Sequence, residues 1–243
     1  MPIAQAALDL LAQFDTPTIC NAIELYGILP QDAGFMDSRI RACFPTLRPM
    51  VGYAATATFR ASFPPPPGGG VYAKMVDQVC SFDSLPGPAV VVIDDLDNPP
   101  VGAVFGEVMC STYRAFGAVG LVSSGAGRDL EQVAELRFPV FTGATICSHG
   151  YPQLIDVASP VRIGGLVVRQ GDLLHGDANG VTSIPMEIAA ELPEVAAEFA
   201  DAERIMLDYL QGPEEKRLAR LAEARTGCAA AIDRLRQRVR RHP

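Results

Sequence analysis

Apolar runs that alternate with helix-like segments between residues 71 and 135 constrain the fold of this chain more than any other feature. The runs PAVVVIDD (88–95) and AVGLVSS (118–124) are almost continuously apolar, which is typical of strands covered on both faces. Helical patterns surround them, in VYAKMVDQVCSF (71–82), in AVFGEVMCSTYRAFG (103–117) and directly after Arg128-Asp129. Repeated strand–helix units of this kind predict an α/β protein in which helices pack on a sheet.

Short strands dominate the stretch from residue 138 to residue 185. β-favouring runs there are joined by glycines, and DANG at 177–180 is a strong hairpin turn. Residues 51–59 (VGYAATATF) form an earlier strand of the same alternating character. These strands predict a sandwich or small barrel-like core rather than a simple doubly wound sheet.

The segment FPPPPGGG (63–70) cannot form regular structure, because its prolines are extended and its glycines are loose. Two interpretations stay open for it, a mobile loop and a lid over a site.

Residues 186–243 have helical patterning, interrupted at Gly212-Pro213. We therefore divide the chain into an α/β core over residues 1–185 and a C-terminal helical extension over residues 186–243. So much helix after a closed core is expected to pack at interfaces between subunits.

The composition is that of a globular chain, with 49% hydrophobic and 20% charged residues among 243. A formal net charge of −8 disfavours general nucleic-acid binding, which requires neutralisation of phosphates. No apolar run approaches the ~20 residues of a membrane span, and the N-terminus lacks the basic start of a signal peptide. The six cysteines form no C-x-x-C pair, which fits a reduced compartment. We expect a cytoplasmic protein with neither a nucleic-acid nor a membrane partner.

The loop SSGAGRDLEQV (123–133) lies between an apolar strand and a helix start, where anion sites often form. It lacks the lysine of a phosphate-binding P-loop and the third glycine of a dinucleotide fingerprint. One interpretation is structural, in which Asp129 caps its own helix, Gln132 completes a capping box and Arg128 is an ordinary surface cation. The other places a carboxylate for a hard divalent cation beside a guanidinium for a substrate carboxylate.

The loop is also part of a longer pattern. Glu107 in FGEVM is followed, after twenty intervening residues, by Arg128-Asp129. With TPTICNAI, VGYAATATF, FPVFTGA and the closing block GGLVVRQGDLLHGDANGVTSIP, this pattern resembles the RraA-like family, which includes 4-hydroxy-4-methyl-2-oxoglutarate aldolases and proteins that regulate ribonuclease E. The resemblance spans roughly residues 15–205. It implies a layered β/β/α core of the swivelling type with a helical C-terminal extension.

The resemblance implies a metal site. Asp129 would ligate Mg²⁺ or Mn²⁺ directly, with water filling most of the coordination sphere, and Glu107 would hold one of these waters. Glu203 from a neighbouring subunit would complete the site through a further water, with Glu198 as the alternative residue.

The resemblance also implies a substrate site and two catalytic residues, Arg128 and Glu107. Arg128 would bind the keto-acid end of a small 2-oxo acid, and the backbone N–H groups of Glu107, Val108 and Met109 would bind its carboxylate. The metal would act as a Lewis acid, so that no lysine Schiff base is needed.

The implied function is a metal-dependent lyase of the class II pyruvate aldolase type. It would cleave 4-hydroxy-2-oxo acids such as 4-hydroxy-4-methyl-2-oxoglutarate to pyruvate, with oxaloacetate decarboxylation as a related activity. One alternative is a non-catalytic regulator that binds a ribonuclease or a helicase. Another is a lyase for a different hydroxy acid, which the 63–70 loop and the 147–154 segment would select. In each case we expect a homotrimer or a hexamer.

Five further residues have weaker signals. Ser124 stands where the family commonly has Asp, and His149 lies on the substrate side, where contact with substrate is the less favoured interpretation. We expect His175 to be a packed core residue rather than a ligand, and Asp172 and Asp177 to form turns.

Overall fold

The computed structural model describes residues 3–240, without the side chains of residues 71 and 72. Its centre is a nine-stranded sheet, in which β6, β5, β3 and β2 lie side by side and parallel. The short strand β4 pairs in parallel with the last residues of β5. Antiparallel strands complete both edges, and β8 and β9 form a separate hairpin. The strands are β1 Arg41–Ala42, β2 Met50–Arg60, β3 Ala89–Asp95, β4 Ala103–Phe105, β5 Gly120–Gly127, β6 Val140–Thr145, β7 Gln153–Val157, β8 Val161–Ile163, β9 Leu166–Val168, β10 Leu173–Asp177 and β11 Gly180–Ile184.

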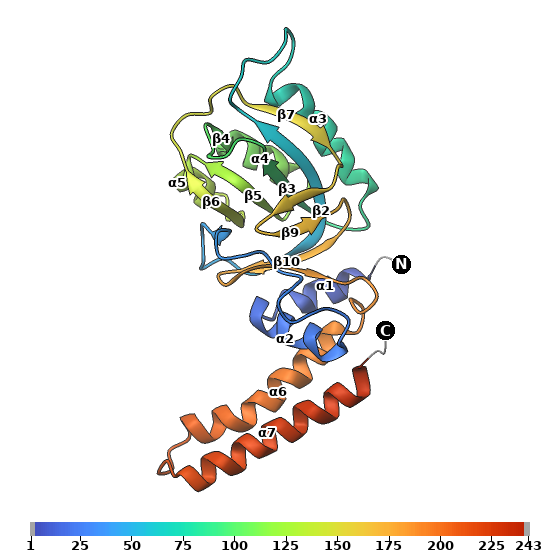
Figure 1. Cartoon of the computed structure of the whole chain (residues 1–243), viewed down its shortest axis with the longest axis vertical. Helices are drawn as coiled ribbons and strands as arrows, with labels where there is room; N and C mark the ends of the chain where they lie inside the picture. Colours follow the sequence, from blue (N-terminus) through green and yellow to red (C-terminus); the bar gives the residue numbers. More distant parts are fainter. Residues whose placement is uncertain (1–2, 241–243) are drawn as a thin grey trace.

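Helices cover one face of this sheet and strands cover the other. Alternate residues of β2, β3 and β5 point to opposite faces, so that Val91 packs among the helices and Val90 against the β8–β9 and β10–β11 hairpins. The result is the layered β/β/α core that the sequence predicted (Figure 1). The helices are α1 Gln5–Leu11, α2 Thr16–Tyr26, α3 Val71–Cys80, α4 Glu107–Ala115, α5 Leu130–Glu135, α6 Leu192–Gln211 and α7 Leu218–Val239, with a short 3₁₀ turn at Ser81–Ser84.

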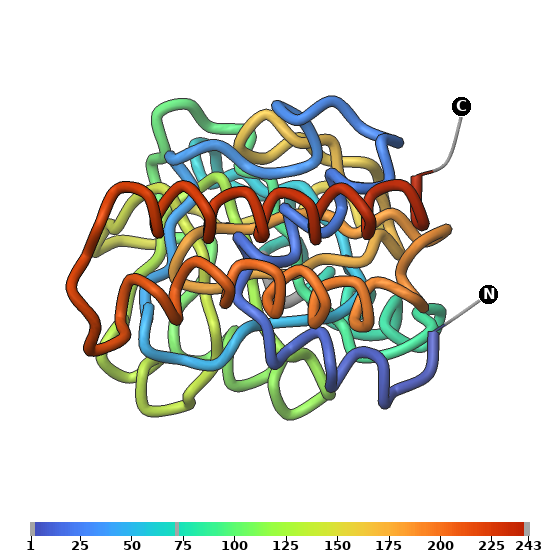
Figure 2. Tube along the Cα trace, turned by 90° about the horizontal axis from the view of Figure 1, so that it is seen from below, coloured from blue at the N-terminus to red at the C-terminus, as the bar shows by residue number. Residues whose placement is uncertain are grey.

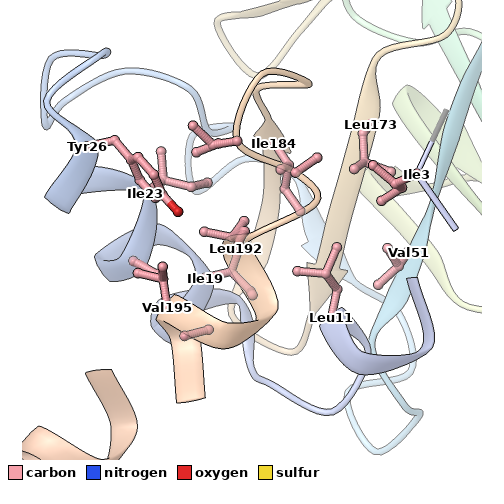
Figure 3. Close-up of a cluster of buried hydrophobic side chains, with 14 of the residues drawn as sticks. Ile3, Leu11, Ile19, Ile23, Tyr26, Val51, Leu173, Ile184, Leu192 and Val195 are labelled. Carbon is pink, nitrogen blue, oxygen red and sulfur yellow. The ribbon is translucent and has the colours of Figure 1, made fainter. Parts of the chain in front are cut away.

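A second hydrophobic cluster joins the N-terminal and C-terminal helices to the lower end of the sheet. Leu11, Ile19 and Leu192 are completely buried there, together with Leu173 of β10 (Figure 3). Burying a side chain of this size removes apolar surface from water and stabilises the fold by about 1.5–3 kcal/mol. The beginning of α6 is therefore fixed on its own chain, through α1, α2 and the sheet.

The C-terminal helices form an antiparallel hairpin at the end of the molecule opposite the 63–70 loop (Figures 1 and 2). The predicted helix break at Gly212-Pro213 is confirmed, since α6 ends at Gln211 and α7 begins at Leu218. Tyr209 secures the turn, because its hydroxyl donates to the Arg217 carbonyl oxygen over 2.9 Å. Among the described residues, no helix is both long enough and apolar enough to cross a bilayer.

The predicted helix over 103–117 is wrong at its start. Ala103–Phe105 is a buried strand, β4, that pairs in parallel with the end of β5, and α4 begins only at Glu107. The three residues are apolar and include β-branched Val104 and aromatic Phe105, which suits them to a buried strand. Gly106 separates the two elements and brings Glu107 to the first turn of a helix.

Candidate functional site

The site residues gather at the edge of the sheet where the parallel strands end. Arg128 and Asp129 directly follow β5, and β4 holds them in place, because the Arg128 N–H donates to the Phe105 carbonyl oxygen over 3.1 Å. Carboxyl edges of parallel sheets are where open α/β proteins bind their ligands. The strand–loop–helix order that the sequence predicted thus brings both residues to a position suited to chemistry.

Residues 123–127, which were predicted from the sequence as part of a loop, instead form the last part of strand β5, because they pair with β4 and β6. A Cβ on Gly127 would lie 2.0 Å from the Phe105 ring, and one on Gly125 would lie 2.4 Å from a methyl group of Val104. Both residues must therefore be glycine for β4 to pack closely on β5. The end of β5 presents Arg128 and Asp129 directly after it.

Asp129 does not cap its own helix, so the predicted capping box is wrong. Its backbone is left-handed, with φ 54°, and its side chain makes no capping bond to α5. Instead, Oδ2 accepts a hydrogen bond of 3.2 Å from the N–H of Glu107 and lies 3.7 Å from Nε of Arg128. Non-glycine residues with a left-handed backbone are uncommon and concentrate at functional sites.

Gly106 makes the close approach of Asp129 to α4 possible. A Cβ at this position would lie 2.5 Å from the Asp129 Oδ2 and 3.2 Å from the Arg128 side chain. The side chains of Arg128 and Asp129 are 36% and 40% exposed, so that both remain accessible to a ligand.

The first turn of α4 provides backbone N–H groups at the same place. Glu107, Val108 and Met109 occupy its first three positions, whose N–H groups have no acceptor within the helix itself. The Glu107 N–H is already donated to Asp129, which leaves those of Val108 and Met109 for a ligand carboxylate.

These residues line one part of a cavity of about 400 Å³. Arg128, Asp129, Val108 and Met109 stand along one side, and Phe105 of β4 also contributes. A cavity of this size accommodates a small organic acid. The structure therefore brings together, at one cavity, all the predicted site residues except Glu107, whose side chain is exposed beside it, and Glu203.

The other part of the cavity comes from residues for which the sequence offered only weak signals. His149, Tyr151 and Pro152 follow β6, and Pro65 and Gly70 belong to the proline–glycine loop. The loop lies at the cavity, which is compatible with the lid interpretation, and a lid role stays a prediction. Tyr151 belongs to the segment 147–154 that the sequence placed on the substrate side, but the sequence did not single it out within that segment.

His149 lies at the cavity, as the less favoured interpretation proposed. Its Nδ1 lies 2.7 Å from the Gly150 carbonyl oxygen, so Nδ1 carries the proton in the neutral ring. Nε2 is then left as an acceptor.

Ser124 connects β5 to the end of β3. Its hydroxyl donates to Asp94 over 2.7 Å and accepts the Asp95 N–H over 2.8 Å. Burial raises the pKa of the neighbouring Asp95 to about 6. The hydrogen bond from the Asp97 N–H acts in the opposite direction, whereas the charges of Asp97 and Asp94 raise the pKa further. A neutral hydroxyl at position 124 therefore avoids a further charge beside two carboxylates.

His175 is a packed core residue, as predicted. Its Nδ1 lies 3.0 Å from the Thr16 hydroxyl and its Nε2 3.1 Å from the Leu11 carbonyl oxygen, so the neutral Nε2–H tautomer satisfies both contacts. Asp172 and Asp177 form turns, also as predicted, since each accepts a backbone N–H within three residues of itself.

Glu203 lies on α6, in the helical end of the molecule, whereas Asp129 directly precedes α5, which packs at the other end (Figure 1). Burial and the nearby Asp15 raise the pKa of the Glu203 carboxyl above its usual value. Its predicted role involves a neighbouring subunit and stays a prediction.

The donor chemistry at Asp129 fits a hard divalent cation. Oδ2 is engaged by Glu107 and Arg128, and the exposed carboxylate borders both the cavity and a second, open hollow next to Cys147. Within residues 3–240, no cluster of three or more His, Cys, Asp or Glu side chains could hold a metal ion. One carboxylate with several retained waters is the arrangement that Mg²⁺ accepts most readily.

The layered fold, the glutamate at a helix start and the Arg-Asp pair after β5 define a class of α/β proteins with a small polar site at the carboxyl edge of the sheet. The chain belongs to the RraA-like family (Aldolase/RraA), whose pattern matches residues 16–182.

Individual relatives agree with this assignment. A Halalkalibacterium halodurans protein with the name "Putative 4-hydroxy-4-methyl-2-oxoglutarate aldolase" is 27% identical over 191 residues, which cover 75% of this chain and 80% of that protein. An uncharacterized protein from Pseudomonas syringae pv. tomato has the same fold, with a TM-score of 0.72, 25% identity and coverage of 93% of this chain and 95% of that one. A Streptomyces coelicolor member of the RNase ES inhibitor RraA family shares the fold at a TM-score of 0.66 and 21% identity, over 84% and 96% of the two chains.

Proposed function

We propose that this chain is a divalent-metal-dependent lyase that cleaves 4-hydroxy-2-oxo acids, such as 4-hydroxy-4-methyl-2-oxoglutarate, to pyruvate. The observation that carries the proposal is the placement of Arg128 and Asp129 side by side on a cavity, with the start of α4 beside them. Family membership and the aldolase name of one relative support the same chemistry.

Arg128 and the first turn of α4 bind the keto-acid end of the substrate in this proposal. A guanidinium presents a planar fork of donors, which suits a carboxylate or a keto oxygen. The N–H groups of Val108 and Met109 point out of a helix N-terminus, where the helix dipole also favours an anion. Together these groups fix the orientation of the 2-oxo acid without any covalent bond to the protein.

Asp129 is the proposed direct ligand of Mg²⁺ or Mn²⁺, and Glu107 the residue that holds a water in its coordination sphere. When bound, the cation would supply Lewis-acid polarisation of the keto oxygen. Glu107 is suited to its role because its helix start is bonded to Asp129 while its side chain remains exposed.

The proposed reaction breaks the bond between C3 and C4. The C4 hydroxyl loses its proton and becomes a carbonyl group, and the electron pair of the broken bond remains on C3. Protonation of C3 then yields pyruvate, and the second product is an aldehyde, a ketone or a 2-oxo acid. Decarboxylation of oxaloacetate leaves the same electron pair on C3, so we propose it as a second activity.

We also propose that the active protein is a homotrimer or a hexamer in which the helical extension packs between subunits. Glu203 of one subunit would then complete the metal site of the next, entering from the open hollow beside Asp129 and Cys147. In a closed ring of identical subunits the same interface recurs, so each site would be completed in the same way.

The experiment is a coupled assay of pyruvate release from 4-hydroxy-4-methyl-2-oxoglutarate and from oxaloacetate, with Mg²⁺ and then with a chelator. We expect turnover that disappears with chelator and returns with added Mg²⁺. Turnover that ignores the chelator contradicts the metal role. Absence of turnover on every 2-oxo acid favours the alternative, a non-catalytic regulator that binds a ribonuclease or a helicase.

A further inference from the structure

The cavity has two ends, and both are attached to β4. At the C-terminal end of this strand, the Phe105 carbonyl oxygen accepts the Arg128 N–H over 3.1 Å. At its N-terminal end, the Ala103 N–H donates to the Ser148 carbonyl oxygen over 2.9 Å, which fixes the segment that carries His149 and Tyr151. Two strand residues span roughly 7 Å. A substrate whose keto-acid end lies at Arg128 therefore extends its C4 end toward His149 and Tyr151.

The second end of the cavity is built mainly from apolar surfaces. Pro65, Tyr151 and Pro152 line it, and Val108 of α4 lines the same cavity. Val108 and Tyr151 are 58% and 52% exposed, although both are large and largely apolar. Ligand pockets are lined mainly by hydrophobic and aromatic side chains, and a lining of this kind suits an apolar ligand group.

Hydrogen bonds hold this apolar end in a fixed shape. The Tyr151 N–H donates to the Ala61 carbonyl oxygen over 2.9 Å. Nε2 of Gln153 donates to the carbonyl oxygens of Phe63 and Tyr151 over 2.5 and 3.2 Å, which ties the proline–glycine loop to the segment after β6. Gly102 also permits close packing, because a Cβ there would lie 2.5 Å from the His149 carbonyl oxygen. A wall ordered in this way loses little freedom when a ligand binds.

The charges of the cavity are concentrated at its first end. In the described part of the chain, Arg128 is the lining residue with a permanent positive charge, and it is used by the keto-acid end. A second carboxylate at C4 would lose water against two prolines and a tyrosine ring, and Nε2 of His149, an acceptor in the neutral ring, would not donate a hydrogen bond to it. An alkyl or aryl group in the same place would remove apolar surface from water, which is favourable.

We propose that this site selects 4-hydroxy-2-oxo acids with a single carboxylate and an apolar substituent at C4, and that Tyr151 and Pro65 are specificity-determining residues. This inference rests on the proposed lyase function and narrows its substrate class. The apolar substituent lies against Tyr151 and Pro65, and the carbonyl product that it forms leaves from that end.

The test compares kcat/KM for pyruvate release from monocarboxylic 4-hydroxy-2-oxo acids with hydrogen, methyl, propyl or phenyl at C4, and from 4-hydroxy-4-methyl-2-oxoglutarate. We expect kcat/KM to rise along the apolar series and to exceed that of the dicarboxylic acid by about tenfold or more. Equal or better cleavage of the dicarboxylic acid overturns the inference while the lyase function stands. Absence of pyruvate from every compound overturns both.

Variants at Tyr151 provide the second arm of the test. Tyr151→Ser should remove most of the preference for the phenyl compound, whereas Tyr151→Phe, which keeps the ring, should retain it. Phe116→Ser is the matched control, because Phe116 is 63% exposed at the end of α4 and does not line the cavity. An unchanged preference in Tyr151→Ser overturns the assignment of this residue.

Discussion

The backbone N–H of Glu107 donates to the carboxylate of Asp129 over 3.2 Å, although the two residues are 22 positions apart in the sequence. This bond joins the start of α4 to the loop that follows β5. It positions the proposed metal ligand against the turn that supplies the proposed carboxylate-binding N–H groups. The stretch between Glu107 and Asp129 thus contains one helix, α4, and one strand, β5, which together bring the two residues to the same site.

The close approach at Gly106 predicts a specific loss of function. In Gly106→Ala the new methyl group would lie 2.5 Å from the Asp129 Oδ2, so the carboxylate must move. Displacing a group next to a metal site typically lowers metal affinity or activity by about 10–100-fold, and we expect a loss of this size in Mg²⁺-dependent pyruvate release. Gly227→Ala on α7 is the control, because its nearest contact would be an ordinary 3.4 Å to the Ile205 side chain. Equal activities of the two variants would contradict the proposed position of Asp129.

Ser124 is predicted to contribute to stability. Ser124→Ala removes the hydrogen bonds to Asp94 and to the Asp95 N–H, and leaves half-buried polar groups without these partners. We expect the free energy of unfolding in urea to fall by about 1–3 kcal/mol. Ser84→Ala, which removes an exposed bond of 2.7 Å to the Ser81 carbonyl oxygen, should change it much less. If the free energy of unfolding fell less in Ser124→Ala than in Ser84→Ala, the hydrogen bonds of the Ser124 hydroxyl would not contribute to stability.

His175 is predicted to make the fold sensitive to mild acid. Burial lowers the pKa of His175 below 6.5. The hydrogen bond to the Leu11 carbonyl oxygen and the charges of Asp177 and Asp15 raise the pKa, but by less than burial lowers it. The unfolded chain then binds the proton more readily, so the stability from the neutral ring is complete above about pH 6.5 and is lost as pH falls. An NMR titration of the ring in the folded protein should give a midpoint below 6.5, and a midpoint above 6.5 would contradict this environment.

A variant distinguishes the effect of His175 on the pH dependence of stability from that of Asp95, which acts in the opposite direction. Because the pKa of Asp95 is raised to about 6, its contribution to stability grows as pH falls through that value. The free energy of unfolding should therefore be compared between the wild type and His175→Gln at pH 7.5 and 5.5. The wild type should lose more stability than the variant over this range.

The proposed site between subunits predicts recovery of activity in mixed assemblies. Asp129→Asn and Glu203→Gln should each lower pyruvate release, the first strongly and the second about tenfold. If one site uses Asp129 of one subunit and Glu203 of the next, subunits dissociated and reassembled together should regain part of the wild-type activity. Activity of the mixture that equals the average of the two variants would place both residues in the same subunit or remove Glu203 from the site.

Much of the fold follows from local patterns in the sequence. The apolar runs at 88–95 and 118–124 are buried strands, and the DANG turn joins β10 to β11. Residues 103–105 were harder to predict, because three apolar residues before a glycine fit a helix or a strand equally well. Only pairing with the end of β5, a contact between distant segments, decides for the strand.

The candidate site divides in the same way. Glu107, Arg128 and Asp129 form a pattern with fixed spacing, so the sequence resemblance could identify them. The orientation of the Asp129 carboxylate could not be predicted, because helix capping and the contact with α4 use the same residue. The segments 63–70 and 147–154 could be proposed as a pair that selects the substrate, but the individual residues Pro65 and Tyr151 could not, because two irregular segments bring them to the cavity.

The most direct test of the account is a measurement of Mn²⁺ binding by the loss of the free-ion electron paramagnetic resonance signal, with pyruvate present. The wild type should bind Mn²⁺ at one site per chain, and Asp208→Asn, a change at an exposed position on α6, should bind it equally well. Asp129→Asn should lose this binding almost completely. Undiminished binding of Mn²⁺ by Asp129→Asn would contradict the proposal that Asp129 ligates the metal directly.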